Sequence, residues 1–320
     1  MARKNMLTSV SLLFGALLSL LYLARLAVAE PNAVVLERLP YTFDFDGPAQ
    51  DEPNLVFVGS WPETPKKMMV YSVNEPNVTE AFVRKLALEY FGIGAGAALS
   101  RSRRLGLYRF RTDTEYLQVN PANGTFSLRK IRKGIPPAEI MKSYPLRQEC
   151  KTIAEQYLTR RDLLPKEAYF RGVVDNTRGA DVMSIGFGRK VNGYKTWGAG
   201  GGIGVHIGCG GDIIAIRKAW QDLSPYKMYP IKTPQQSLEE LCNGKGVLMH
   251  GSKGRVENIE VRYYTSPEKQ EYVQPIYYFD CNSADGAFYG VVSAIQEQYL
   301  KSREETLKEL KEKREGTVRK

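Results

Sequence analysis

Histidine is scarce in this chain, with only His206 and His250 among 320 residues. Catalytic triads and general acid–base sites most often depend on histidine, and no His-Glu-x-x-His sequence occurs. The sequence therefore contains no recognisable histidine-based catalytic set. We expect a protein that is not an enzyme.

Carboxylate pairs are the remaining candidates for catalysis. Asp280 with Asp285, and Asp175 with Asp181, have the residue type that acid–base cleavage of glycans requires. Both pairs flank predicted turns, where aspartate commonly accepts hydrogen bonds from its own backbone. We assign no catalytic residue, and an envelope hydrolase that acts on wall polymers or peptides through turn carboxylates is kept as an alternative.

Cysteine is also sparse, and all four cysteines follow the N-terminal hydrophobic run: Cys150, Cys209, Cys242 and Cys281. In an oxidising compartment four cysteines allow three disulfide connectivities. We favour Cys242 with Cys281, because one ends a predicted helix and the other ends a predicted strand. This choice leaves Cys150 with Cys209.

A metal site is the alternative use of these thiols. His206, Cys209, Cys242 and His250 have the mixed ligand types that bind zinc. Their spacing does not repeat the short paired knuckles of structural zinc sites. The sequence therefore predicts no metal and no cofactor.

Long hydrophobic runs are absent after the N-terminus. Met6–Ala24 is uncharged and mostly apolar, follows Arg3 and Lys4, and precedes small residues suited to cleavage before Glu30. Its nineteen residues also approach the length that spans a bilayer, about 20 residues. The sequence predicts an extracytoplasmic protein, either secreted or tethered to the membrane through residues 6–24.

Basic residues exceed acidic ones, giving a formal net charge of +10. No nucleic-acid-binding module surrounds the basic clusters, so we expect no nucleic acid partner. Charge runs are usually solvated, but a passive module that binds anionic surfaces or ligands through an Arg-rich face is a further alternative. The clusters are Arg101 with Arg103 and Arg104, Arg109 with Arg111, Arg129 with Lys130, and Arg132 with Lys133.

A glycine-rich run occupies residues 198–204 within the stretch 184–220. It is not a dinucleotide fingerprint, because Ile203 stands where the third glycine is needed and the run lies between predicted strands. The glycines either bend a strand or clear a groove in which a partner segment adds as a strand. The candidate partner-binding residues are Tyr194, Trp197, Gly200, Gly201 and Gly202, whereas we expect Trp220 in the core before a turn at Ser224-Pro225.

Helical periodicity occurs three times, over Glu80–Phe91, Gln148–Leu158 and Thr233–Cys242. Period-2 strand patterns follow each helix, and Asn192-Gly193 favours a tight hairpin. This order predicts an α+β protein of repeated helix-plus-antiparallel-sheet units, with helices packed on one face of each sheet.

The chain is expected to divide into five segments. A signal peptide or membrane anchor (1–29) and an extended leading segment rich in proline and acidic residues (30–66) come first. An N-terminal α+β domain (67–140), a C-terminal domain of two units (141–295) and a charged helix or tail (296–320) follow.

Several stretches of the chain resemble a known family. They are the hairpin Phe187–Tyr194, the glycine-rich strand ending at Trp220, the helix Thr233–Leu241, the strand Val256–Tyr264 and the segment Val273–Phe279. Over roughly residues 145–295 they are similar to the PepSY-like domains of the YycI/YycH type. The resemblance implies PepSY/cystatin-like units in an extracytoplasmic regulatory protein that restrains a sensor kinase or inhibits a protease.

These observations together predict an exported, non-enzymatic envelope protein that binds and regulates another extracytoplasmic protein.

Overall fold

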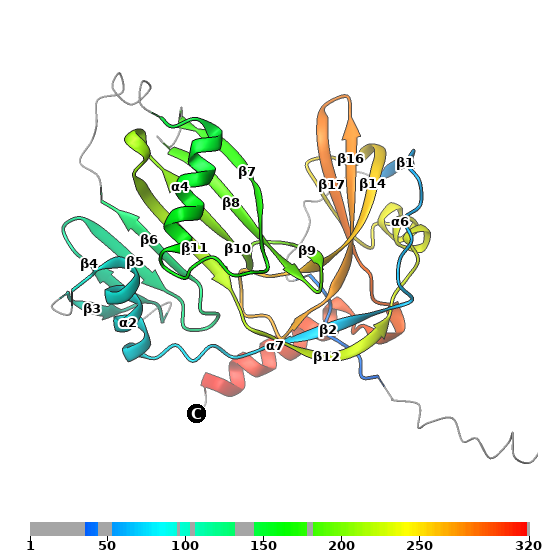
Figure 1. Ribbon diagram of the computed structural model, residues 1–320. Helices are drawn as coiled ribbons and strands as arrows, with labels where there is room; N and C mark the ends of the chain where they lie inside the picture. The colour runs from blue at the N-terminus through cyan, green and yellow to red at the C-terminus, as the bar shows by residue number, and fades with distance from the viewer. Residues whose placement is uncertain are drawn as a thin grey trace, which may run out of the picture. The chain divides into compact units, whose positions relative to one another are not determined.

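The computed structural model describes residues 36–43, 53–94, 97–102, 106–131, 144–177 and 182–318 (Figure 1). The chain divides into the units Met1–Glu37 and Arg38–Lys320, and all that follows concerns the second unit. The predicted export segment and its cleavage position lie outside the described residues. None of the described helices is long and apolar enough to span a membrane.

Strands dominate the described residues. One sheet contains β1 (Asn54–Phe57), β3 (Leu99–Arg101), β4 (Tyr108–Arg111), β5 (Glu115–Val119), β6 (Phe126–Lys130), β7 (Ala168–Asn176), β8 (Val182–Val191), β9 (Tyr194–Trp197), β10 (Gly201–Ile207), β11 (Ile213–Trp220), β13 (Val247–Met249), β14 (Lys253–Tyr264), β16 (Pro275–Ser283) and β17 (Gly286–Ser293). A smaller sheet contains β2 (Lys67–Val73), β12 (Leu223–Pro230) and β15 (Tyr272–Val273). The α-helices are α2 (Glu80–Phe91), α4 (Arg147–Thr159), α6 (Pro234–Cys242) and α7 (Arg303–Val318), and Cys209–Gly211 and Glu297–Tyr299 form 3₁₀ turns.

The large sheet has 14 described strands in the order β13-β17-β16-β14-β9-β8-β10-β11-β6-β5-β4-β3, with β1 added to β14 and β7 to β8. The small sheet has the order β12-β2-β15. The prediction of repeated helix-plus-sheet units is therefore wrong, as is the PepSY/cystatin-like architecture. Strands from the predicted segments 67–140 and 141–295 join because β6 pairs with β11, and this pairing is not visible in local sequence patterns.

The helix positions were predicted well because their end signals are local. Thr79 Oγ1 accepts a hydrogen bond from Phe82 N at 3.2 Å, and Gly92 ends α2 with a φ of 67°. Thr233 and Gln236 form a capping box at the start of α6. Each of these signals lies within a few residues of the helix that it bounds.

Two stretches outside the predicted strands also pair. The predicted turn at Ser224-Pro225 is wrong, because both residues lie in β12, which pairs with β2 through a bulge after Pro225. Within residues 30–66, β1 pairs in parallel with β14. Tyr263 links the two sheets, since its hydroxyl donates to Met69 O at 2.9 Å.

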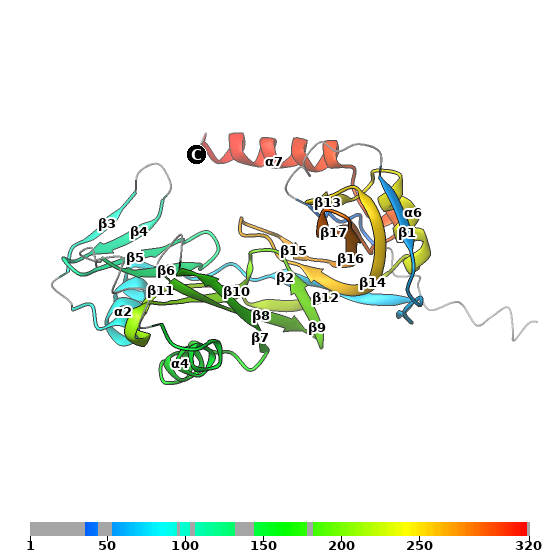
Figure 2. The ribbon, with the colours of Figure 1, turned by 90° about the horizontal axis from the view of Figure 1, so that it is seen from above.

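One face of strands β3–β11 is packed against α2 and α4, which Figure 2 shows on the same side of the sheet. A continuous cross-strand row of apolar side chains lies under these helices. The row consists of Leu99, Phe110, Leu117, Leu128, Ile216, Val205, Ile185 and Val173. Successive residues of a strand point to opposite faces, so the residues between these positions form a second, open face.

The glycine-rich run lies where the two halves of the large sheet meet. β9 and β14 pair in parallel, with Trp197 opposite Tyr264. Gly200 N then donates to Thr265 O at 3.1 Å, and Thr265 N donates to Trp197 O at 2.9 Å. A Cβ on Gly200 would stand 1.9 Å from Ser266 O. Glycine is therefore required here because two backbones approach closely.

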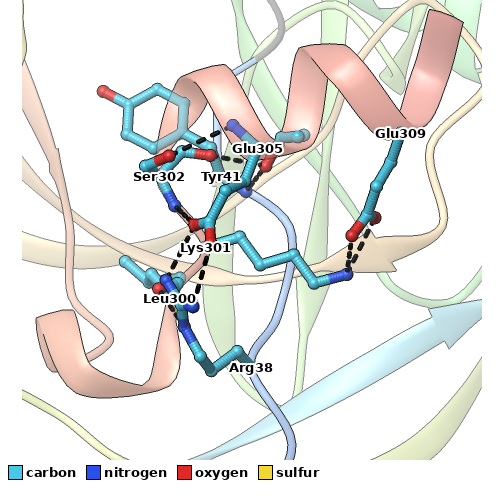
Figure 3. A network of polar contacts seen from close by, with 8 residues as sticks. Arg38, Tyr41, Leu300, Lys301, Ser302, Glu305 and Glu309 are labelled. Atoms are coloured by element: carbon cyan, nitrogen blue, oxygen red, sulfur yellow. Dashed lines mark hydrogen bonds and ion pairs between the residues drawn. The ribbon is translucent and has the colours of Figure 1, made fainter.

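Arg38 and Leu39, at the start of the second unit, form hydrogen bonds with α7 and with the residues just before it (Figure 3). Leu39 N donates to Tyr299 O and Lys301 N donates to Leu39 O, both at 2.8 Å. Arg38 pairs with both carboxylate oxygens of Glu305, at 3.2 and 2.8 Å. Glu305 also accepts from Ser302 N at 2.6 Å and donates its own N–H to Ser302 Oγ at 3.1 Å, which is a capping box. The charged tail predicted at 296–320 thus contains a helix that is fixed at its first turn.

The junction can be tested with a matched pair of glycine substitutions. Gly200→Ala is expected to lower the free energy of unfolding by about 1–3 kcal/mol, because the new methyl group overlaps the backbone of Ser266. Gly204→Ala, where nothing lies within 4 Å of an added Cβ, is expected to leave stability unchanged or raise it by up to about 1 kcal/mol. Urea denaturation of both variants measures the difference, and equal effects would contradict this role of Gly200.

Candidate functional site

The thiols do not form a metal site among the described residues, where no group of three potential ligands gathers. All four cysteines are free in the structure, so the predicted disulfides remain predictions. Burial, together with the nearby Asp280 and Cys242, raises the pKa of Cys281 to about 12. Burial likewise raises the pKa of Cys150 and Cys242. These three thiols therefore stay protonated near neutral pH, the form that neither attacks substrates nor ligates metals.

Each described candidate aspartate takes part in a hydrogen bond. Asp280 accepts a hydrogen bond from Asn258 Nδ2 at 3.2 Å, and Asp175 accepts from Thr177 N at 3.0 Å. Asp285 lies in the hairpin between β16 and β17 and donates its N–H to Ser283 Oγ at 3.2 Å. Asp181 lies outside the described residues. Asp175 and Asp285 match the turn role of aspartate, whereas Asp280 lies within β16 and contacts the neighbouring strand β14.

A serine–histidine pair lies across β8 and β10, which sequence patterns did not predict. Ser184 Oγ lies 3.0 Å from His206 Nδ1, and Asn176 Nδ2 donates to Ser184 Oγ at 2.8 Å. The serine hydroxyl accepts from Asn176, and the direction of its hydrogen bond with His206 Nδ1 is set by the histidine tautomer. Burial lowers the pKa of His206, so the ring is neutral near pH 7. Among the described residues, no carboxylate forms a hydrogen bond or ion pair with the His206 ring. The pair therefore lacks the orienting acid of a catalytic triad.

A polar cleft of about 430 Å³ lies beside α6. Lys232, whose side chain is only 7% exposed, pairs with Glu240 at 2.5 Å. Lys245 at the rim pairs with Glu297 at 3.2 Å. Both lysines that line the cleft are thus already neutralised by carboxylates, and the cleft offers little to an anionic ligand.

The predicted partner-binding residues do not share one environment. Tyr194 packs edge-on against the buried Tyr263, with ring centroids 6.2 Å apart. Gly200 and Gly201 are buried against the segment 265–266, and a Cβ on Gly202 would meet Phe187 O at 3.0 Å. The strand that carries Gly201 and Gly202 is paired on both sides, by β8 and β11. These glycines are therefore accounted for by contacts within the chain.

Trp197 has a different setting, at the start of a row of aromatic rings. It lies against Tyr264 and Phe43 on its buried side, with centroids 5.7 and 6.5 Å away. On its other side Tyr289 lies 5.9 Å away, and Tyr289 stacks on Tyr278 at 5.5 Å. Trp197, Tyr278 and Tyr289 are all half-buried. The row therefore runs from the core outward to solvent.

Charged groups surround the outer end of this row. The Arg262 guanidinium lies 3.5 Å from the Tyr278 ring centroid, a cation–π contact. Burial alone would raise the pKa of Glu260, but Arg262 and Lys195 hold it below its usual value. Burial raises the pKa of Tyr289, and the positive charge of Arg171 on β7 partly offsets this.

We call Trp197, Tyr278, Tyr289 and Arg262 the aromatic surface. Gly290, next to Tyr289, faces Leu241 of α6, so Tyr289 points to the opposite side of the sheet. Only Trp197 was found by sequence reasoning, because Tyr278 and Tyr289 occupy ordinary strand positions and meet it through the β9–β14 and β16–β17 pairings.

No protein-family model matches this chain, and no curated protein matches it. The solved structure of an uncharacterised protein from Eubacterium rectale ATCC 33656 is similar over 77% of this chain and 90% of that one, at 11% identity and a TM-score of 0.43. A likeness of this size supports no conclusion about fold or function.

The low pKa of His206 predicts a pH dependence of stability. Below its usual value of 6.5 the unfolded chain binds a proton that the folded chain still excludes, so the free energy of unfolding falls as pH drops through this range until the folded pKa is reached. Because His206 is partly exposed, the slope stays below the roughly 1.4 kcal/mol per pH unit of one fully excluded proton.

Urea denaturation between pH 7.5 and 5 is expected to show a smaller decline for His206→Gln than for the wild type. His250→Gln, which removes the exposed histidine, is the matched control. An unchanged decline in His206→Gln would contradict the assignment.

Proposed function

We propose that this chain is a non-enzymatic, extracytoplasmic binding protein that contacts a protein partner through its aromatic surface and regulates it. The observation that carries the proposal is the half-buried row of Trp197, Tyr289 and Tyr278 next to Arg262. Tryptophan, tyrosine and arginine are the residue types most enriched among binding hot spots.

Buried aromatic side chains hold Trp197 in place, and this favours a binding role for the aromatic surface. Phe43 and Tyr264 fix Trp197 from behind, so little side-chain freedom is lost when a partner covers it. Pre-ordered side chains reduce the entropy cost of association. Tyr278 and Tyr289 are only half-buried, so a partner can cover them and hydrogen-bond to their hydroxyl groups. Arg262, which pairs with Glu260 at 2.9 Å, lies beside the Tyr278 ring at this rim.

The expected compartment rests on the N-terminal run Met6–Ala24, which has the charge and apolar pattern of an export signal or tether. The class of partner, a sensor kinase or a protease, rests on the resemblance to PepSY-like proteins of the YycI/YycH type. Neither support depends on the aromatic surface, so location, partner class and contact residues are separately testable.

Substitutions in the aromatic surface are expected to weaken partner binding. Tyr289→Ala and Arg262→Ala should each weaken binding at least about tenfold, since hot-spot truncations cost about 2 kcal/mol or more. The measurement is comparative affinity capture from membranes and secreted fractions, followed by titration of the protein that the wild type retains.

Trp61→Ala is the matched control, because Trp61 is 43% exposed but lies beside β1. It should retain the same partner. Thermal unfolding of each variant separates lost binding from lost folding. Equal retention by all three variants, or loss in the Trp61 variant alone, would contradict the proposed contact surface.

A further inference from the structure

The open face of β3–β11, opposite α2 and α4, carries two cross-strand rows of polar side chains and glycines. Because directly paired residues point to the same face, each row can be followed through the strand pairings. The first row is Ser100, Arg109, Gln118, Ser127, Arg217, Gly204, Gly186 and Gly172. The second is Arg111, Tyr116, Arg129, Ala215, His206, Ser184 and Val174.

Four arginines gather in these rows, and we call Arg109, Arg111, Arg129 and Arg217 the arginine face. Neither row contains an aspartate or glutamate, and none of the four arginines has an ion pair among the described residues. The Arg109 Nε is buried without a hydrogen-bond partner. Arg111, Arg129 and Arg217 are exposed. Their charge is therefore uncompensated on a single side of the sheet.

Glycines extend the first row into a smooth floor beside Arg217. Nothing lies within 4 Å of an added Cβ at Gly204 or Gly172, and Gly186 would meet only Arg171 Cβ at 3.6 Å. The space above the backbone is thus open at these positions. At Gly200 and Gly201, where β9 meets β14, neighbouring atoms occupy that space instead. A long ligand lying across the strands would meet no side chain there, and Ser184 and His206 flank it as hydrogen-bonding groups.

The spacing of the arginines suits several separate anionic groups. Arg109 and Arg111 are two residues apart on β4, so their Cα atoms are about 6.7 Å apart. Arg111 and Arg129 are separated by β5, which places their strands about 9.6 Å apart. The four arginines lie on three strands, so a chain of anions laid across these strands can engage successive guanidinium groups.

We propose that the arginine face binds a linear phosphodiester polyanion. Guanidinium groups pair with phosphate through two parallel hydrogen bonds, which favours phosphate over isolated carboxylates. A peptide that adds by backbone pairing cannot join the arginine-bearing strands, because β4, β6 and β11 are each paired on both sides. Insertion at a lipid surface is disfavoured, because Tyr116 and Val174 are the only large nonpolar side chains in the two rows.

The test uses the full-length protein, extracted from membranes and kept in detergent if required. Purified poly(glycerol phosphate) is the probe. The wild type is expected to bind, with the logarithm of the association constant falling linearly as the logarithm of salt concentration rises. Arg111→Gln/Arg129→Gln should weaken binding at least about tenfold and reduce the salt slope by about 1 to 2. Arg111→Lys/Arg129→Lys, which keeps the charge but loses the paired geometry, should lie in between.

The matched control is Lys85→Gln/Lys308→Gln, which removes two exposed charges from α2 and α7. It should stay within about twofold of the wild type, and the arginine variants should keep the thermal stability of the wild type. No binding of the polymer, an equal loss in the control, or binding of poly-glutamate or of phosphatidylglycerol vesicles as tight as the polymer would overturn the proposal. Because the aromatic surface lies on other strands, partner capture should persist in the arginine variants.

Discussion

The close backbone approach between residues 198–201 and 265–266 is the constraint on which the rest of the structure depends. Thr265 N donates to Trp197 O, and Gly200 N donates to Thr265 O, which extends the short parallel pairing of β9 with β14. A side chain at Gly200 would collide with Ser266 O. Without this contact the strands of the two halves would end as separate sheets with exposed edges. With it, Trp197 is placed beside Tyr264, and the aromatic surface exists as one row.

The alternation of side chains along the strands then divides the large sheet into two kinds of surface. Leu117 and Leu128 point to α2 and α4 and are almost completely buried, as part of the hydrophobic core that stabilises that half. Their strand neighbours Gln118 and Arg129 point to the open side. The burial of one row thus fixes the register of the other, because a one-residue slip would exchange the faces. The arginine face is a consequence of this register.

Sequence reasoning succeeded where the signal is local and failed where it is not. Thr79, Gly92 and Thr233 bound helices through contacts with their own neighbours, so these helix positions could be predicted. The pairing of β6 with β11 joins residues far apart in the chain, and its absence from local patterns led to the mistaken prediction of repeated units. The glycine-rich run was recognised as suited to a bulge or to the close approach of another backbone, but the sequence did not indicate that this backbone is residues 265–266 of the same chain.

The sequence by itself determined the helix boundaries, the alternating strand patterns, the scarcity of catalytic histidines and the excess of positive charge, because each depends on residue type and short-range spacing. The tertiary structure decided that the strands form one sheet, that Trp197 meets Tyr289, and that Arg111 and Arg129 share an open face. These arrangements depend on which strands pair and in which register. That choice is set by the burial of side chains across the whole fold, which no local stretch of sequence contains.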